Sequence, residues 1–282
     1  MQRFLSLLTA LALTASCAEL ADILVPPDEQ PLLSYKQRGI HLHPSGALPE
    51  DVPAIMAVAS MIRMQVPKDT ESFVERLVKN SPLNARFLLI LTSSTDLTLV
   101  DKFRDDSRVI GWELENEVDN CAAGFLCWSL GEYLDWLRVI SPEIRRRSPG
   151  KLLVSAATLP PTYEGKLRLN EEFVKRGGLD LVDVFGLHVY GDSWERVPAV
   201  AELVDDVWKK GKQVWVTEFG RPKRNEHLDY FRQTPAVWAR LGVKVDLWTW
   251  YAWREENGYG LVGGADGDSQ LLAELRATSR AP

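Results

Sequence analysis

The chain has 282 residues, of which 45% are hydrophobic and 26% charged, a composition typical of globular proteins. Its net charge of −6 at pH 7 argues against a nucleic-acid-binding surface, which requires a clustered basic face. No Gly/Ser/Pro-rich linker divides the chain after residue 35, and α/β barrels of this length are single domains, so we expect one domain.

The first 18 residues have the layout of a secretory signal peptide. A basic start precedes an apolar run at 4–14 and a short stretch of small residues, and the run is too short for a stable membrane anchor. The residues ending in Cys17 also resemble a bacterial lipobox, with Thr14 where that pattern usually has leucine. We therefore expect export, either as a periplasmic or cell-surface lipoprotein lipidated at Cys17 or as a freely secreted protein. Residues 19–35 would form a linker.

Strand-like runs alternate with helix patterns over residues 36–282. Several runs are rich in Val, Ile and Leu with little alternation, as is typical of parallel strands covered by helices. The expected strands are 39–43, 61–66, 86–92, 109–115, 152–157, 184–189, 213–217 and 243–250. Eight strands, each followed by a helix, predict an α/β protein built as a single (β/α)8 TIM barrel.

Helical periodicity marks the segments between these runs. Thr70 and Ser129 are expected N-caps, and Glu132 three residues after Ser129 completes a capping box. The expected helices include 70–80, 130–147, 195–210, 228–241 and 269–277.

Two cysteines remain when Cys17 is set aside. Cys121 and Cys127 are separated by a short loop-like segment, and a disulfide between them would fit an exported protein. The alternative is a pair of small, unpaired buried residues.

The active site of such a barrel lies at the carboxyl ends of its strands. Polar and aromatic residues are expected to converge there: His41, His43, Arg63, Asn116, Glu117, His188, Tyr190, Glu218, Trp248 and Trp250. Two carboxylates, from the fourth and seventh strands, dominate this set. Hydrolysis of a glycosidic bond needs one carboxylic acid and one carboxylate, and a sugar ring needs a flat apolar surface, for which Trp248, Trp250 and Trp253 are candidates.

Four motifs in chain order resemble the retaining glycoside hydrolases of clan A, most of all families 39 and 5. They are WELENE at 112–117, HVYG at 188–191, VTEFG at 216–220, and WYAWR at 250–254 leading to YGLV at 259–262. The resemblance covers roughly residues 36 to 280. It implies hydrolysis of β-glycosidic bonds in an oligo- or polysaccharide, with no cofactor or metal, by a monomer that contacts a membrane only through a lipid anchor.

The resemblance also implies roles for individual residues. Glu218 would be the nucleophile, and Glu117 the general acid and then the general base. Asn116 would bind the sugar hydroxyl next to the anomeric carbon, Tyr190 would hold Glu218, and Arg63 would keep Glu218 ionised.

Further contacts with substrate are expected from His43, His188 and the tryptophans. His188 would line the site near Glu117, and Trp250 would be the platform under the cleaved sugar, with Trp248 as the alternative. Trp253 is a further candidate.

Glu113, Glu115 and Glu117 would leave the same face if their strand ran through all three. Glu117 is expected to stay protonated beside the charged Glu218. Glu113 would brace the barrel interior, and Glu115 has no assigned role, because the family usually has an apolar residue or glycine there. Val118 also departs from the family, which usually has proline after the acid/base glutamate.

Two other functions are compatible with the sequence. His41 and His43 at the end of the first strand are also how metal-dependent amidohydrolase barrels begin, with His188 as a further ligand. The other is a non-catalytic, glycan-binding surface lipoprotein that uses the same groove.

Overall fold

The computed structural model describes residues 33–120, 127–155, 166–191, 197–222, 224–254, 258–263 and 269–279. The signal peptide with Cys17, most of the expected linker, and Cys121 lie outside these residues, so the predictions made for them remain predictions. None of the described helices is both long and apolar enough to cross a membrane.

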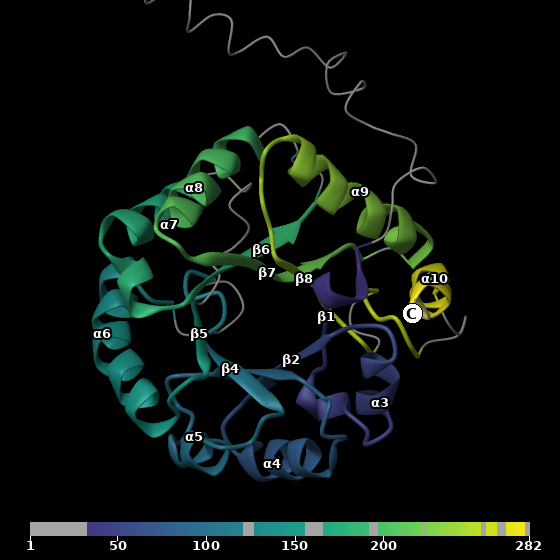
Figure 1. The fold of residues 1–282 in the computed structure, drawn as a ribbon, viewed down its shortest axis with the longest axis horizontal. Coiled ribbons are helices and arrows are strands. Elements are labelled where there is room, and N and C mark those ends of the chain that lie inside the picture. Colours follow the sequence, from purple (N-terminus) through teal and green to yellow (C-terminus); the bar gives the residue numbers. More distant parts are fainter. Residues whose placement is uncertain are drawn as a thin grey trace, which may run out of the picture.

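Eight parallel strands close into a barrel in sequence order, and β8 pairs with β1 (Figure 1). The strands are β1 Arg38–His41, β2 Met61–Val66, β3 Phe87–Leu91, β4 Val109–Leu114, β5 Leu152–Ser155, β6 Val184–Tyr190, β7 Gln213–Gly220 and β8 Leu247–Trp250. The predicted (β/α)8 TIM barrel is therefore confirmed.

Helices form a ring around the barrel (Figure 1). They are α3 Asp51–Met56, α4 Glu71–Asn80, α5 Thr98–Lys102, α6 Leu130–Arg147, α7 Lys166–Lys175, α8 Val197–Lys209, α9 His227–Arg240 and α10 Gln270–Thr278. Because helices cover the outer face of the sheet, both faces of each strand are buried, which explains the apolar runs in the sequence.

The predicted N-cap of α6 is confirmed. The Ser129 side chain accepts a hydrogen bond from the Glu132 backbone N–H, and the Glu132 carboxylate accepts one from the Ser129 N–H at 2.8 Å. Thr70 stands before α4 but makes no side-chain cap bond, because its hydroxyl donates to the Pro67 carbonyl oxygen instead.

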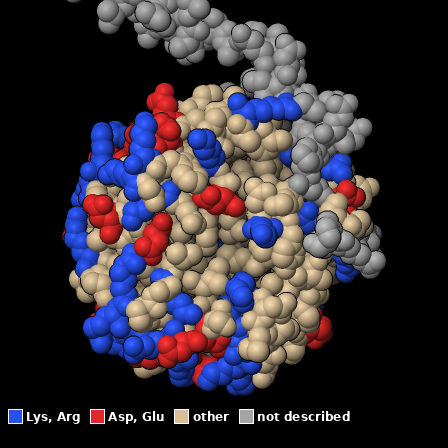
Figure 2. Space-filling view, viewed as in Figure 1, with Lys and Arg blue, Asp and Glu red and all other residues tan. Residues whose placement is uncertain are grey.

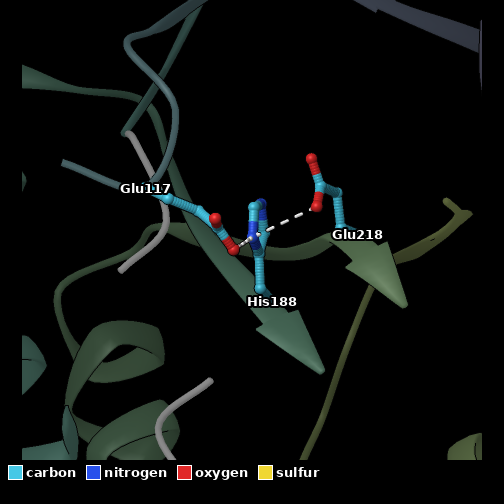
Figure 3. A group of neighbouring side chains, drawn as sticks. All are labelled: Glu117, His188 and Glu218. Carbon is cyan, nitrogen blue, oxygen red and sulfur yellow. Dashed lines mark hydrogen bonds and ion pairs between the residues drawn. The ribbon is translucent and has the colours of Figure 1, made fainter. Parts of the chain in front are cut away.

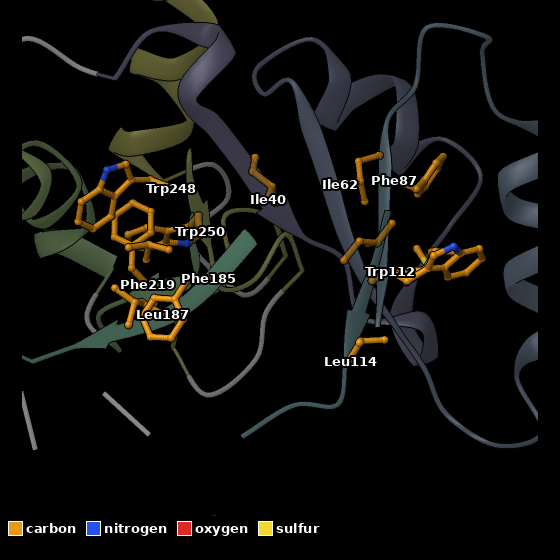
Figure 4. Packing of buried hydrophobic residues seen from close by; sticks show 14 of the residues in the cluster. Ile40, Ile62, Phe87, Trp112, Leu114, Phe185, Leu187, Phe219, Trp248 and Trp250 are labelled. Carbon is orange, nitrogen blue, oxygen red and sulfur yellow. The ribbon is translucent and has the colours of Figure 1, made fainter. Parts of the chain in front are cut away.

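Two apolar clusters form the core. The larger one lies between the barrel and the helices and includes Trp112, Phe219 and Trp248 (Figure 4). The smaller one comes mostly from the first half of the strands and consists of Met61, Leu88, Val154, Val184, Trp215 and Leu247. The buried charged residues Arg63, Glu113 and Glu218 come later in their strands, so the barrel changes from apolar to charged towards the carboxyl ends of the strands.

The surface seen in Figure 2 carries charges of both signs. Lys and Arg are interspersed with Asp and Glu around the periphery of this face, over the helices. Among the described residues, pairs such as Arg146–Glu143 and Lys209–Asp205 are of this mixed kind. This is an ordinary solvated helix surface.

Candidate active site

Arg63 is the centre of a buried polar network. Its guanidinium donates from Nε to Glu113 Oε2 at 2.6 Å, from Nη2 to Glu113 Oε1 at 2.8 Å, and from Nη2 to Asn116 Oδ1 at 2.6 Å. It also donates from Nη1 to Glu218 Oε1. Burial lowers the pKa of Arg63, but the charges of Glu113 and Glu218 outweigh that effect and raise it above its usual range. One cation thus connects β2, β4 and β7.

Glu218 points into the barrel because β7 contains an irregularity. Leu187 of β6 pairs with Val216 and the next residue of β6, His188, pairs with Glu218, so Thr217 is an extra residue in β7. Trp215 faces the barrel interior, and simple alternation would turn Glu218 away from it. The extra residue reverses the alternation, as a β-bulge does, and turns Phe219 outward instead.

The environment of Glu218 favours its ionised form. Its Oε2 accepts a hydrogen bond from the Tyr190 hydroxyl at 2.7 Å, and its Oε1 accepts one from Arg63. Burial raises the pKa of Glu218, but the charges of His188 and Arg63 outweigh burial and lower it. Glu218 is therefore a buried carboxylate that stays ionised.

His188 lies between the two carboxylates (Figure 3). Its Nδ1 is 2.9 Å from Glu117 Oε1 and 3.4 Å from Glu218 Oε2. One oxygen of each carboxylate and a His188 nitrogen all lie within 4.8 Å of one another. Burial lowers the pKa of His188, but the charge of Glu218 and the hydrogen bond and charge of Glu117 raise it overall.

The expectation that Glu117 holds the acid proton is wrong for this arrangement. Burial raises the pKa of Glu117, but the hydrogen bond and charge of His188 and the hydrogen bond from Asn120 Nδ2, at 2.8 Å, outweigh burial and lower it. The surroundings therefore favour the protonated form of His188, within hydrogen-bond reach of Glu117.

The three glutamates of β4 do not share a face. The strand ends at Leu114, and Glu115 and Glu117 have left-handed φ angles of 73° and 44°, which interrupt the alternation. Glu113 binds Arg63 inside the barrel, Glu115 binds the backbone of Ser93 in the loop after β3, and Glu117 faces His188.

The tryptophans are not sugar platforms, contrary to the sequence prediction. Trp248 and Trp250 are 3% and 0% exposed, and both pack edge-on against Phe219 in the helix layer (Figure 4). On β8, Leu247 faces the barrel interior, so alternation turns these two rings outward. Trp253 is 2% exposed and donates from Nε1 to Asp51 Oδ1 at 2.9 Å.

Tyrosines stand where the tryptophans were expected. The Tyr251 ring is 6.0 Å from Tyr190 and 5.1 Å from Tyr259, both edge-on, and stacks on His41 at 5.9 Å. All three tyrosines are partly exposed, and Tyr190 binds Glu218 directly. Neither Tyr251 nor Tyr259 was among the residues that the sequence predicted for the site. Alternation along β8 could have identified Tyr251. Leu247 faces the barrel interior, so the residue four positions later, just after the strand, is expected on the same side.

The histidines of β1 differ in their surroundings. His41 is buried with Nδ1 3.1 Å from Arg63 Nη1, and burial together with the Arg63 charge lowers its pKa to about 3. His43 is partly buried in the loop after β1, and its Nδ1 is 2.7 Å from Ser45 Oγ. Within the described residues, the one cluster with metal-ligand geometry is Glu117, His188 and Glu218, and it includes neither histidine of β1. A guanidinium beside His41 would repel a metal cation, which argues against the amidohydrolase interpretation.

The loop after β4 is held at its far end. The Trp128 backbone N–H donates to the Val118 carbonyl oxygen at 2.8 Å, and Cys127 is disulfide-bonded. Its predicted partner, Cys121, lies outside the described residues.

Comparison with known proteins places the fold among glycoside hydrolases. No family model matches the chain, and no curated protein sequence matches it. A family 39 glycoside hydrolase from the gut symbiont Bacteroides cellulosilyticus WH2 matches with a TM-score of 0.57 and 16% identity, over 91% of this chain and 65% of its own, slightly under two thirds.

Two further solved structures match with similar scores. A family 128 endo-β-1,3-glucanase from Amycolatopsis mediterranei, in complex with laminaritriose, has a TM-score of 0.57 and 18% identity over 86% of this chain and 99% of its own. A family 30 xylanase from Clostridium acetobutylicum has a TM-score of 0.60 and 12% identity over 89% and 73%. These likenesses establish that the chain has the barrel fold found in clan A glycoside hydrolases, the group that its sequence motifs resemble.

Proposed function

We propose that this protein is a retaining glycoside hydrolase that cleaves β-glycosidic bonds of an oligo- or polysaccharide. The observation that carries the proposal is the pair Glu117, in the segment after β4, and Glu218 of β7, with one oxygen of each carboxylate within 4.8 Å of the other. Retaining enzymes have their carboxyl groups about 5–5.5 Å apart, whereas inverting enzymes need about 6.5–9.5 Å to admit a water. The single atom His188 Nδ1 contacts an oxygen of both carboxylates, so the two groups are close to each other, which favours double displacement.

Glu218 is the nucleophile in this proposal. It is ionised, buried and held by Tyr190 and Arg63, so it can attack the anomeric carbon and form a glycosyl-enzyme. Forming that ester removes the Glu218 charge, which lowers the proton affinity of its neighbours.

Glu117 is the acid and then the base. In the resting site the proton lies on His188, and its transfer to Glu117 Oε1 across 2.9 Å supplies the acid that protonates the leaving oxygen. In the second step Glu117 removes a proton from the water that attacks the glycosyl-enzyme. The amide of Asn116, whose oxygen is bound by Arg63, keeps its N–H groups for the sugar hydroxyl next to the anomeric carbon.

Two observations support a β-linked glycan as substrate: the solved structures with the same fold, and the tyrosines at the site. The structures with the same fold include an endo-β-1,3-glucanase holding laminaritriose and a xylanase, both of which act on β-linked glycans. Tyr251 and Tyr259 supply partly exposed rings for the apolar face of a sugar, next to Tyr190, which binds Glu218.

Hydrolysis of β-glucans, mannans, xylans and galactans by the purified protein tests the proposal. We expect cleavage of at least one, loss of cleavage in Glu218→Ala with the folded circular dichroism spectrum kept at the assay temperature, and a first product of unchanged anomeric configuration by NMR. An inverted first product would contradict retention. Binding of an oligosaccharide without cleavage by the wild type would instead identify a glycan-binding protein.

Export and lipidation at Cys17 remain predictions of the sequence. Mass analysis of the mature N-terminus from cells would test them. A diacylated Cys17 supports the lipoprotein, cleavage after Ala18 supports free secretion, and an intact N-terminus contradicts both.

A further inference from the structure

Glu115 is a buried carboxylate that the proposed reaction does not use. It follows β4 directly, has a left-handed φ of 73°, and is 9% exposed. Its backbone N–H donates to the Leu91 carbonyl oxygen at 2.8 Å, so it continues the pairing of β3 with β4 by one residue. A bulky residue in this backbone conformation costs free energy that surrounding contacts must offset.

The contacts of the Glu115 carboxylate identify those surroundings. It accepts a hydrogen bond from the backbone N–H of Ser93. Ser93 lies in the loop between β3 and α5. This side chain therefore ties that loop to the backbone that carries the next two residues of the site.

The loop is itself anchored on the barrel. The Thr92 N–H donates to Thr95 Oγ1 at 2.9 Å, and Thr95 Oγ1 donates to the Val66 carbonyl oxygen at the end of β2, at 3.2 Å. Hydrogen bonds therefore connect the end of β2 to this loop, and the loop to Glu115, the residue before Asn116. They restrain the backbone at Asn116 from outside its own strand.

The conformation of Asn116 and Glu117, which follow Glu115, depends on this restraint. Asn116 accepts from Arg63, and Glu117 has a second left-handed φ, of 44°, with its carbonyl oxygen bound by the Asn120 N–H at 2.8 Å. Asn116 lies between two residues with left-handed φ angles. This conformation is unfavourable for glutamate, so contacts of the surrounding residues must hold the turn.

We propose that Glu115 is a positioning residue, which fixes the turn at Asn116 and so holds the Glu117 carboxyl at His188 in the geometry for proton transfer. This inference rests on the function proposed above. Burial raises the pKa of Glu115, and the hydrogen bond from Ser93 offsets this only in part, so a costly buried carboxylate is kept at this place. In this role Glu115 acts through its carboxylate oxygen, which accepts the hydrogen bond from Ser93, and not through an ion pair.

The test compares Glu115→Ala with Glu115→Gln in the full chain, with Glu132→Ala as a control. Glu132→Ala removes a carboxylate that also accepts a backbone N–H, but at the start of α6. Each variant is assayed on a phenyl and a dinitrophenyl β-glycoside of the sugar that the wild type cleaves. Only the phenyl leaving group needs the proton from Glu117.

We expect Glu115→Ala to lower kcat/KM on the phenyl glycoside by about 100-fold, as a misplacement of about 1 Å does, with a much smaller loss on the dinitrophenyl glycoside. Glu115→Gln keeps a carbonyl oxygen for the Ser93 N–H and should restore most of the activity. Amide hydrogen exchange at Ser93 and Asn116 should accelerate in Glu115→Ala and not in Glu132→Ala.

Equal losses on both glycosides, or wild-type kinetics in Glu115→Ala, would overturn the positioning role. If the wild type cleaves no glycoside, the proposed function fails, and hydrogen exchange then decides the present inference separately. In that case unchanged exchange at Ser93 and Asn116 overturns it, and accelerated exchange supports it.

Discussion

At the scale of single residues, the main feature is one imidazole between two carboxylates. His188 Nδ1 is close enough to both Glu117 and Glu218 that the three groups titrate together and share protons. A single proton shared by these groups can reside on His188 or on Glu117, which gives two states of the same total charge. The second is the state that can protonate a leaving group.

The pH dependence of activity should report this shared proton. The pKa of His188 is raised, so the wild type keeps its acid proton above pH 6.5 and loses kcat/KM as the pH rises through the raised pKa. His188→Gln leaves the proton to a carboxyl, so we expect the alkaline limb of a plot of kcat/KM against pH to move to lower pH. An unmoved alkaline limb would remove His188 from the proton transfer.

Tyr251 should contribute to substrate binding. Tyr251→Ala removes a partly exposed ring beside Tyr190, and we expect kcat/KM to fall about tenfold, equivalent to about 1.4 kcal/mol, with little change in unfolding temperature. Trp250→Ala is the matched comparison. That ring is fully buried, so its loss should instead cost about 3–5 kcal/mol of stability. Unchanged kinetics in Tyr251→Ala would exclude it as a sugar contact.

At the scale of secondary-structure elements, the ends of β4 and β7 decide which side chains enter the site. The extra residue at Thr217 turns Glu218 inward, and two left-handed residues after β4 separate the directions of Glu115 and Glu117. Both irregularities lie at the carboxyl ends of strands, where bulges and strained residues commonly aim functional groups.

The stability of α6 should depend on its capping box. Ser129→Ala removes the acceptor for the Glu132 N–H, so we expect a loss of about 1 kcal/mol and a fall of about 2–4 °C in thermal unfolding temperature. Activity measured well below that temperature should stay at the wild-type level, because the cap contacts no residue of the site. Circular dichroism and the glycoside assay together check this, and an unchanged unfolding temperature would contradict the capping role.

At the scale of the whole molecule, the buried network around Arg63 connects strands from opposite sides of the barrel. Removing one member of a buried ion pair leaves the other charge without compensation, which costs about 3–5 kcal/mol. Arg63→Met should therefore lower the free energy of unfolding by about that amount at neutral pH, because Glu113 and Glu218 both lose their cation.

The cost should also depend on pH. The pKa of Glu218 is lowered in the folded state, so its stabilising contribution is complete above the ordinary value of 4.5 and disappears as the pH falls through the lowered pKa. The difference between wild type and Arg63→Met in urea unfolding should shrink over that acid range. Arg146→Met is the control, since solvent screens its exposed pair with Glu143 and the substitution should change stability little. Equal effects of the two substitutions would contradict the argument.

Much of the fold could be predicted because the relevant signals are local. The apolar runs, the start of α6 at Ser129 and the spacing of strands all follow from residues close together in the chain. The positions of Glu117 and Glu218 at the ends of β4 and β7 follow from strand order alone. The directions of Trp248 and Trp250 could not be predicted in this way. Their strand has only four residues, all of them apolar or small, so its sequence does not show which side chains face the interior, and pairing with β1 and β7 decides this.

The sequence by itself determined the closed barrel and the two strand ends that carry carboxylates, because strand number, order and covering helices depend on periodicity along the chain. Only the tertiary structure decided that tyrosines rather than tryptophans line the site, that His188 lies between the two carboxylates, and that Glu115 binds the loop after a different strand. The physical reason is that side-chain direction depends on bulges and register between strands, and proton affinity depends on burial and on charges brought together from distant parts of the chain.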